Sequence, residues 1–77
     1  MQITYDLVRA AMVDLSAHDV SGRRVATLQR GLRRAGAHRV FWNGRDAAGR
    51  PVPSGIYWIR VTEGGRPVAE ERWVKLR

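Results

Sequence analysis

The stretch from Phe41 to Tyr57 constrains the fold of this chain more than any other part of the sequence. It begins at the end of an apolar run, continues through a polar, glycine-rich segment, and ends where an apolar alternating run begins. Asn43-Gly44 and Ala48-Gly49 are turn signals, because glycine adopts positive φ angles without a steric clash. Pro53 lacks an N–H group and therefore belongs before a strand rather than inside a central one. The stretch predicts a long structured corner between two strands.

Alternating apolar residues predict strands on both sides of this corner. The period of two that is typical of half-buried strands covers residues 3–7, 13–17, 23–28, 38–42, 56–62 and 67–76. Asp19–Gly22 and Gly64-Gly65 carry turn signals that indicate hairpins. Residues 7–17 have an alternative interpretation as a short helix, since their apolar residues also fit a helical spacing. Their β-branched residues and the turn that follows favour strands.

Six to seven short strands separated by turns are typical of an all-β antiparallel sandwich or a small barrel. The 77 residues suffice for one domain with a thin core. Residues 29–37 are expected to form a polar connection, with Leu32 tucked beneath it. In the last strand Trp73 and Val74 fall on opposite faces, and a bulge near Glu70-Glu71 would bring the apolar residues into phase.

The chain is strongly basic, with 14 basic residues against 7 acidic ones and a net charge of +7. Thirteen of the basic residues are arginine, a bias that a GC-rich coding sequence would produce without any functional cause. The functional alternative is a basic surface for nucleic acid, anionic glycan or lipid head groups. Its candidate residues lie in the middle of the chain and are Arg23, Arg24, Arg33, Arg34 and Arg39.

Several classes of function lack support in the sequence. There is no cysteine, so disulfides and cysteine-ligated metals are excluded, and no apolar run approaches the ~20 residues of a membrane span. A hydrolytic triad could be drawn only from Ser16 or Ser54, His18 or His38, and Asp14 or Asp19, with no nucleophile elbow to support it. Both histidines are expected to face solvent. Asn43 and Asp46 offer oxygens to a calcium ion, but turn capping explains them better.

The order of the motifs carries a resemblance that no single motif would carry. In sequence they are Val13-Asp14-Leu15, Asp19-Val20-Ser21-Gly22-Arg23, Val25-Ala26-Thr27-Leu28, Ala35-Gly36-Ala37-His38, Trp42-Asn43-Gly44-Arg45-Asp46, Gly49-Arg50-Pro51-Val52 and Pro53-Ser54-Gly55-Ile56-Tyr57. This set, which spans residues 3–77, resembles the immunoglobulin-like domain family of the flagellar hook-capping protein FlgD. It is also similar to the C-terminal, type A sorting-like domains of secreted bacterial proteins.

The resemblance implies an immunoglobulin- or fibronectin III-like sandwich over residues 1–77, placed at the C-terminus of a larger bacterial protein. That protein is expected to be exported and to lie outside the cell or on its surface. The resemblance implies a module that is not an enzyme, has no cofactor or metal, and acts by contact with protein partners. One alternative is a secretion or sorting signal, and another is a small basic nucleic-acid-binding domain, which lacks a base-stacking motif. The oligomeric state stays open.

Two groups of residues follow from the strand phases and the resemblance. Partner contact is expected on the outward face of residues 56–62, through Ile56 and Trp58, with Trp73 as a third candidate that faces either outward or into the core. The second group builds the corner, in which Tyr57 resembles the tyrosine whose hydroxyl bonds nearby backbone in immunoglobulin-like folds. The corner residues are Trp42, Asn43, Gly44, Asp46, Gly49, Pro53, Gly55 and Tyr57.

Overall fold

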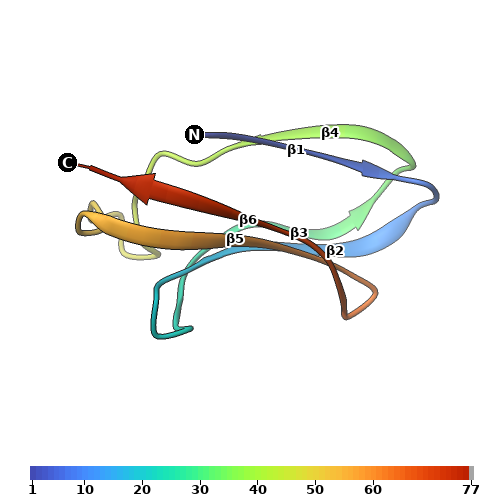
Figure 1. The fold of residues 1–77 in the computed structure, drawn as a ribbon. Helices are drawn as coiled ribbons and strands as arrows, with labels where there is room; N and C mark the ends of the chain where they lie inside the picture. Colours follow the sequence, from blue (N-terminus) through green and yellow to red (C-terminus); the bar gives the residue numbers. More distant parts are fainter. Residues whose placement is uncertain (77) are drawn as a thin grey trace.

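The computed structural model describes residues 1–76, which form two antiparallel sheets packed face to face (Figure 1). The strands are β1 (Gln2–Leu7), β2 (Ala11–His18), β3 (Arg24–Arg33), β4 (Gly36–Phe41), β5 (Gly55–Glu63) and β6 (Arg66–Lys75). One sheet pairs β1 with β4, and the other has the order β3-β2-β5-β6. The all-β antiparallel sandwich predicted from the sequence is confirmed. Residues 7–17 contain the end of β1 and most of β2 rather than a helix.

The core lies between the two sheets and follows the period of two that marks the strands. Ile3, Tyr5 and Leu7 of β1 point toward the four-stranded sheet and are buried, whereas the residues between them are exposed. The four-stranded sheet contributes alternate residues of its two central strands, β2 and β5. These are Val13, Leu15, Ala17, Tyr57, Ile59 and Val61. Leu15 and Ala17 are 0% exposed, so the centre of the core excludes solvent although the core is thin.

β3 is longer than the sequence suggested, and the predicted polar connection over residues 29–37 is largely absent. β3 continues to Arg33 and β4 begins at Gly36. Leu32 is 66% exposed, because it pairs with the exposed Met12 on the outward side of the sheet. The expectation that Leu32 would be buried beneath a connection is therefore wrong.

The last strand contains a bulge, but it lies closer to the β5–β6 turn than predicted, and it leaves Trp73 and Val74 on opposite faces. Val61 pairs with Ala69 and Thr62 with Pro67, so Val68 is the extra residue. From Ala69 onward, Trp73 shares a face with the core residues of β5, because it pairs with Tyr57. Glu70-Glu71 are regularly paired with β5 instead.

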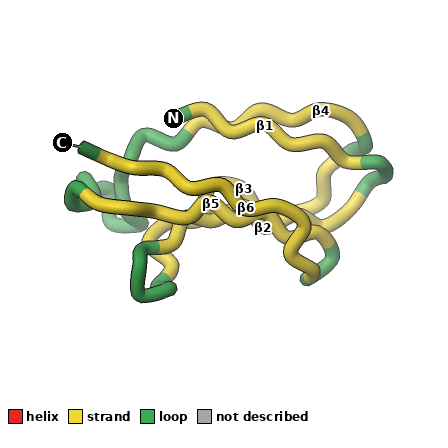
Figure 2. Tube along the Cα trace, viewed as in Figure 1, coloured by secondary structure: helices red, strands yellow, loops and turns green. Residues whose placement is uncertain are grey.

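Figure 2 shows that the corner of residues 42–54 and both ends of the described chain lie at the same end of the sandwich. Trp42 donates its backbone N–H to the Met1 carbonyl at 2.8 Å, and the Met1 amino group donates to the Trp42 carbonyl at 2.9 Å. These two bonds tie the start of the chain to the corner. None of the described residues forms a helix long and apolar enough to cross a membrane.

Candidate functional site

The corner is held by side chains that satisfy the backbone of its own turns. The Asn43 Oδ1 atom accepts from the Arg45 N–H at 3.0 Å, and the Asp46 Oδ1 atom accepts from Ala48 at 2.9 Å and Arg50 at 3.0 Å. These are the local bonds that Asx turns make. Tyr57 donates its hydroxyl to the Pro53 carbonyl, the geometry expected of a corner tyrosine. The side-chain oxygens of Asn43 and Asp46 thus already accept hydrogen bonds from backbone N–H groups.

The three glycines of the corner all have positive φ angles, and one of them is also closely packed. Gly44 is buried with φ of 75°, and a Cβ atom there would lie 3.5 Å from the Trp73 ring. The positive φ angle therefore favours glycine at this position, whereas the Trp73 ring lies at an ordinary van der Waals distance. Gly49 and Gly55 have φ of 82° and 151° with open space around them.

Three aromatic rings meet beneath the corner and decide where Trp73 points. Its ring centroid lies 4.9 Å from that of Trp42 and 6.0 Å from that of Tyr57, and the Trp42 and Tyr57 centroids are 5.9 Å apart. The planes of Trp42 are steeply inclined to both partners, at 65° and 75°, an edge-to-face packing that aromatic rings prefer. Trp73 belongs to this internal cluster, so of the two facings left open for it the structure has the inward one.

The outward face of the four-stranded sheet carries the other two expected contact residues. Ile56 is 37% exposed and pairs with Val74, which is 46% exposed. Trp58 is half-buried and lies between its partner Arg72 on β6 and its partner His18 on β2. We call Ile56, Trp58, Arg72 and Val74 the Trp58 surface. Val74 therefore lies on this outward face beside Ile56, and Trp73 does not.

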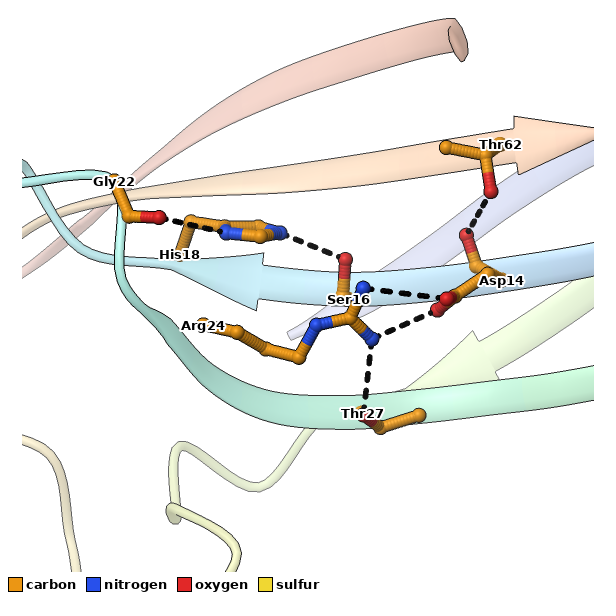
Figure 3. A network of polar contacts seen from close by, with 7 residues as sticks. All are labelled: Asp14, Ser16, His18, Gly22, Arg24, Thr27 and Thr62. Carbon is orange, nitrogen blue, oxygen red and sulfur yellow. Dashed lines mark hydrogen bonds and ion pairs between the residues drawn. The ribbon is translucent and has the colours of Figure 1, made fainter. Parts of the chain in front are cut away.

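Beside the Trp58 surface lies a polar network that sequence reasoning missed (Figure 3). Ser16 and His18 are only 2% and 7% exposed although they point away from the core, which contradicts the expectation that His18 faces solvent. Their Oγ and Nε2 atoms are 2.8 Å apart, and Nδ1 lies 3.3 Å from the Gly22 carbonyl oxygen. Because a carbonyl only accepts, Nδ1 carries the proton in the neutral ring and Ser16 donates to Nε2.

Asp14 and Arg24 extend this network across β2 and β3. The Arg24 guanidinium donates to both Asp14 carboxylate oxygens at 3.0 and 3.2 Å, and also to the Thr27 hydroxyl at 3.1 Å. Thr62 donates to the Asp14 carbonyl from β5. Within residues 1–76, no buried side-chain nitrogen or oxygen lacks a hydrogen-bond partner. The network therefore joins three strands of the sheet with its polar groups satisfied.

A serine that donates to a histidine is also the first half of a hydrolytic site. Here the third group is the Gly22 carbonyl rather than a carboxylate, and the Ser16 side chain has almost no contact with solvent. A nucleophile must approach the substrate carbonyl closely, and a 2% exposed residue beneath its neighbours does not allow that approach. His38 is elsewhere, stacked on Tyr5 in the other sheet with 5.1 Å between centroids. The Ser16–His18 pair thus belongs to a local chain of hydrogen bonds that holds the end of β2 to the turn at Gly22.

The arginines proposed as a basic patch are not gathered on one face. Arg23 pairs with Asp19 at 3.5 Å and Arg24 with Asp14, so two of the five positive charges are compensated locally. Arg33 ends β3, Arg34 follows it, and Arg39 lies on β4 of the other sheet. No cluster of three or more histidine, cysteine or acidic residues suited to a metal occurs in residues 1–76.

The corner carboxylate gives the fold an acid-sensitive element. Backbone hydrogen bonds, first from Arg50 and then from Ala48, hold the pKa of Asp46 below its ordinary value, and the Arg50 charge adds to them. A carboxyl whose pKa is lowered by folding stabilises the fold above its unfolded pKa of about 3.9, and this contribution is lost as the pH falls through the folded value. We expect Asp46→Asn, which keeps an acceptor oxygen but cannot ionise, to flatten the acid side of the stability curve.

The measurement is urea denaturation of the wild type and of Asp46→Asn from neutral pH to strong acid. Glu71→Gln is the control, because it removes an exposed carboxylate for which the described residues provide no hydrogen bond or ion pair. A variant curve as steep in acid as the wild-type curve would show that Asp46 does not carry the effect.

Known proteins resemble this chain in sequence and in fold. The family model of the FlgD Ig-like domain matches residues 1–66. Basal-body rod modification protein FlgD of Salmonella typhimurium, and the protein of the same name in Salmonella typhi, are 42% identical over 53 residues, or 69% of this chain. A crystal structure of FlgD from P. aeruginosa superposes with a TM-score of 0.73 over 95% of this chain at 21% identity.

The relatives are longer proteins, and their names correct one expectation. The matching part spans 23% of each Salmonella protein and 59% of the P. aeruginosa chain. The expectation of an extracellular or cell-surface location is wrong, because the relatives are named basal-body rod modification proteins, a flagellar designation. The family match and the shared fold together show that this chain belongs to the FlgD Ig-like domain family.

Proposed function

We propose that this domain is a non-catalytic contact module in flagellar assembly, and that it binds a protein partner through the Trp58 surface. The observation that carries the proposal is the exposure of Ile56 and Val74 beside a half-buried tryptophan, on a sheet face that no other element covers. The names of the relatives support the setting, since both Salmonella proteins are described as basal-body rod modification proteins.

The chemistry of the surface fits a protein partner. Tryptophan and arginine are enriched in the residues that dominate binding energy at protein interfaces. Here Trp58 and Arg72 are direct cross-strand partners, with the apolar pair Ile56 and Val74 next along the strands. These side chains stand on paired strands whose backbone is already ordered, so little backbone entropy is lost on binding.

The proposal assigns no reaction to the domain. The described residues most similar to a catalytic pair, Ser16 and His18, are buried and held in structural hydrogen bonds. The corner oxygens of Asn43 and Asp46 accept from backbone N–H groups. Affinity for a partner surface therefore accounts better for the exposed chemistry of this chain than turnover of a small substrate.

Truncating the tryptophan tests the proposal directly. In a strain that lacks the gene for this chain, we expect a copy with Trp58→Ala to restore motility poorly, while protein level and thermal unfolding stay close to wild type. Burial of a tryptophan at an interface is commonly worth about 2 kcal/mol or more, or at least a ~30-fold loss of affinity.

Two further variants keep this test decisive. Ile56→Asp places a charge on the same surface and should reproduce the defect. Val8→Ala is the matched control, because Val8 is 92% exposed in the link between β1 and β2, and it should restore motility fully. Normal motility with both Trp58→Ala and Ile56→Asp would refute the assignment of this surface.

A further inference from the structure

A short stretch of the sequence occurs twice in this chain. Residues 18–25 read His-Asp-Val-Ser-Gly-Arg-Arg-Val, and residues 45–52 read Arg-Asp-Ala-Ala-Gly-Arg-Pro-Val. Aspartate, glycine, arginine and valine recur at the same positions of the two stretches. In both, the first and seventh residues are antiparallel partners, so each stretch closes a loop. We call residues 19–23 loop 1 and residues 46–50 loop 2.

The same hydrogen bonds hold both loops. The aspartate N–H donates to the arginine carbonyl at 3.0 Å in loop 1 and 2.8 Å in loop 2, and the glycine N–H donates to the aspartate carbonyl at 3.0 and 2.9 Å. The aspartate Oδ1 atom accepts from the N–H groups two and four residues later, at 2.9 to 3.0 Å. The side chain before the aspartate, His18 or Arg45, donates to the glycine carbonyl. The chain therefore uses one local structure twice.

The two loops differ in what their tips contact. Ala47, which follows the aspartate of loop 2, donates its N–H to the Val25 carbonyl of β3 at 3.2 Å, so loop 2 is docked on a strand. Val20 has the same place in loop 1, but within residues 1–76 its N–H has no hydrogen-bond partner. The Val20 side chain is 72% exposed. Loop 1 thus presents to solvent the backbone group that docks loop 2.

Loop 1 lies next to the Trp58 surface. Figure 1 shows that the turn between β2 and β3 projects from the four-stranded sheet on the side away from β1 and β4. Trp58 alternates with the core residues of β5 and therefore points to that same side. His18, the residue before loop 1, is the partner of Trp58 on β2. A protein that covers Trp58 would therefore meet the tip of loop 1 as well.

We propose that loop 1 docks on an exposed β-strand of the partner protein, as loop 2 docks on β3 in this chain. The Val20 N–H donates to a free backbone carbonyl of that strand, and the Val20 side chain packs on its apolar residues. Local hydrogen bonds already hold the loop in its docking conformation, so little entropy is lost. Arg23 is paired with Asp19, which suits an uncharged carbonyl better than a phosphate. The inference rests on the proposed contact function and names the partner element that this end of the domain meets.

Proline at the loop tips tests the comparison between the two loops. Val20 and Ala47 are the second residues of hydrogen-bonded β-turns, and no described residue other than glycine has a positive φ. This is the type I geometry, in which proline is favoured at the second position. We expect Val20→Pro to melt at or slightly above the wild-type temperature. Ala47→Pro should melt about 5 °C below Val20→Pro, because only loop 2 loses a bond within the chain. Equal melting temperatures would mean that the Ala47 bond does not dock loop 2, and would overturn the inference.

Motility in the strain that lacks the gene for this chain tests the contact with the partner. Val20→Pro should restore motility poorly although it is folded, because a partner carbonyl left without its donor weakens affinity by about 5- to 100-fold. Val20→Ala keeps the N–H and should restore motility better than Val20→Pro. Full motility with Val20→Pro, or equal defects of the two variants, would overturn the inference. A defect of Trp58→Ala in the same assay would then leave the proposed function of the Trp58 surface standing.

A crosslink identifies the element on which loop 1 docks. The photoreactive amino acid p-benzoylphenylalanine replaces Val20 in the same cells, and the crosslinked peptides are mapped by mass spectrometry. We expect the crosslinks to fall on an exposed strand of one flagellar protein. The matched control carries the same group in place of Val8, which is 92% exposed in the link between β1 and β2, and should give no such crosslink. Crosslinks from position 20 to a helix or to nucleic acid, or an equal yield from both positions, would overturn the inference.

Discussion

Replacing Trp42 by alanine is expected to lower the free energy of unfolding by about 3–5 kcal/mol. The Trp42 side chain is 3% exposed, packs edge-to-face on Trp73 and Tyr57, and donates its indole N–H to the Arg45 carbonyl at 3.0 Å. Truncating a buried tryptophan costs about 3–5 kcal/mol. A domain of this length has a total stability of roughly 4–12 kcal/mol, so the variant loses a large part of it.

The loss of stability should exceed the sum of the individual contacts of Trp42, because three elements meet at its ring. Trp42 directly follows β4, Tyr57 lies on β5 and Trp73 on β6, so the cluster joins both sheets to the corner. Trp42→Phe is the matched control. It keeps an aromatic ring but loses the indole hydrogen bond and some volume, and we expect it to remain folded with about 1–2 kcal/mol less stability.

Urea denaturation followed by circular dichroism distinguishes these outcomes, because it does not depend on tryptophan fluorescence. If the free energy of unfolding of Trp42→Ala lies within 0.5 kcal/mol of the wild-type value, the corner is not the main contact that holds the two sheets together. In that case the two sheets would have to be held chiefly by the β2 and β5 residues at the centre of the core.

The strands were predictable because each depends on a local pattern. β1, β2 and β5 alternate apolar and polar residues and end near turn residues, so their existence and facing followed from the period of two. The corner was predictable for a similar reason: Asn43 and Asp46 cap turns within a few residues of themselves. Local chemistry of this kind depends little on what the rest of the chain does.

The sequence alone does not place residues whose facing changes when the strand register shifts by one position. Trp73 could not be placed, because the phase of β6 depends on the position of a bulge, and Pro67 and Val68 carry no signal as strong as a glycine. Leu32 looked buried because it is apolar, yet its pairing with Met12 sets it on the outward side. Both depend on register with a neighbouring strand, which sequence does not display for an isolated segment.

The burial of Ser16 and His18 could not be predicted from alternation alone. Alternation assigned them correctly to the face away from the core, but a residue on that face is buried when long side chains of adjacent strands cover it. Their cross-strand neighbours on β5 are Trp58, paired with His18, and Arg60, paired with Ser16, which lie 40 and 44 positions away in the sequence. The one available signal was the presence of a serine and a histidine two residues apart on a central strand.

The second large effect is expected at the centre of the core. Leu15 is 0% exposed and lies on β2, the strand that pairs with both β3 and β5. Leu15→Ala removes buried methyl groups and leaves a cavity that closely packed neighbours cannot fill, at a cost of about 2–5 kcal/mol. In a core only two sheets thick, there is no second layer of side chains to move into the space.

The same strand supplies the control for this prediction. Met12 is 57% exposed on β2, so Met12→Ala truncates a side chain of similar size while removing little buried area, and the free energy of unfolding should change by no more than about 0.5 kcal/mol. Thermal denaturation gives both values. Equal losses for the two variants would mean that β2 contributes through its backbone pairing rather than through the buried face of Leu15. A large loss of stability for Leu15→Ala alone would show that the core between the sheets, on the side of β2 and β5 opposite Trp58, carries much of the stability of the sandwich.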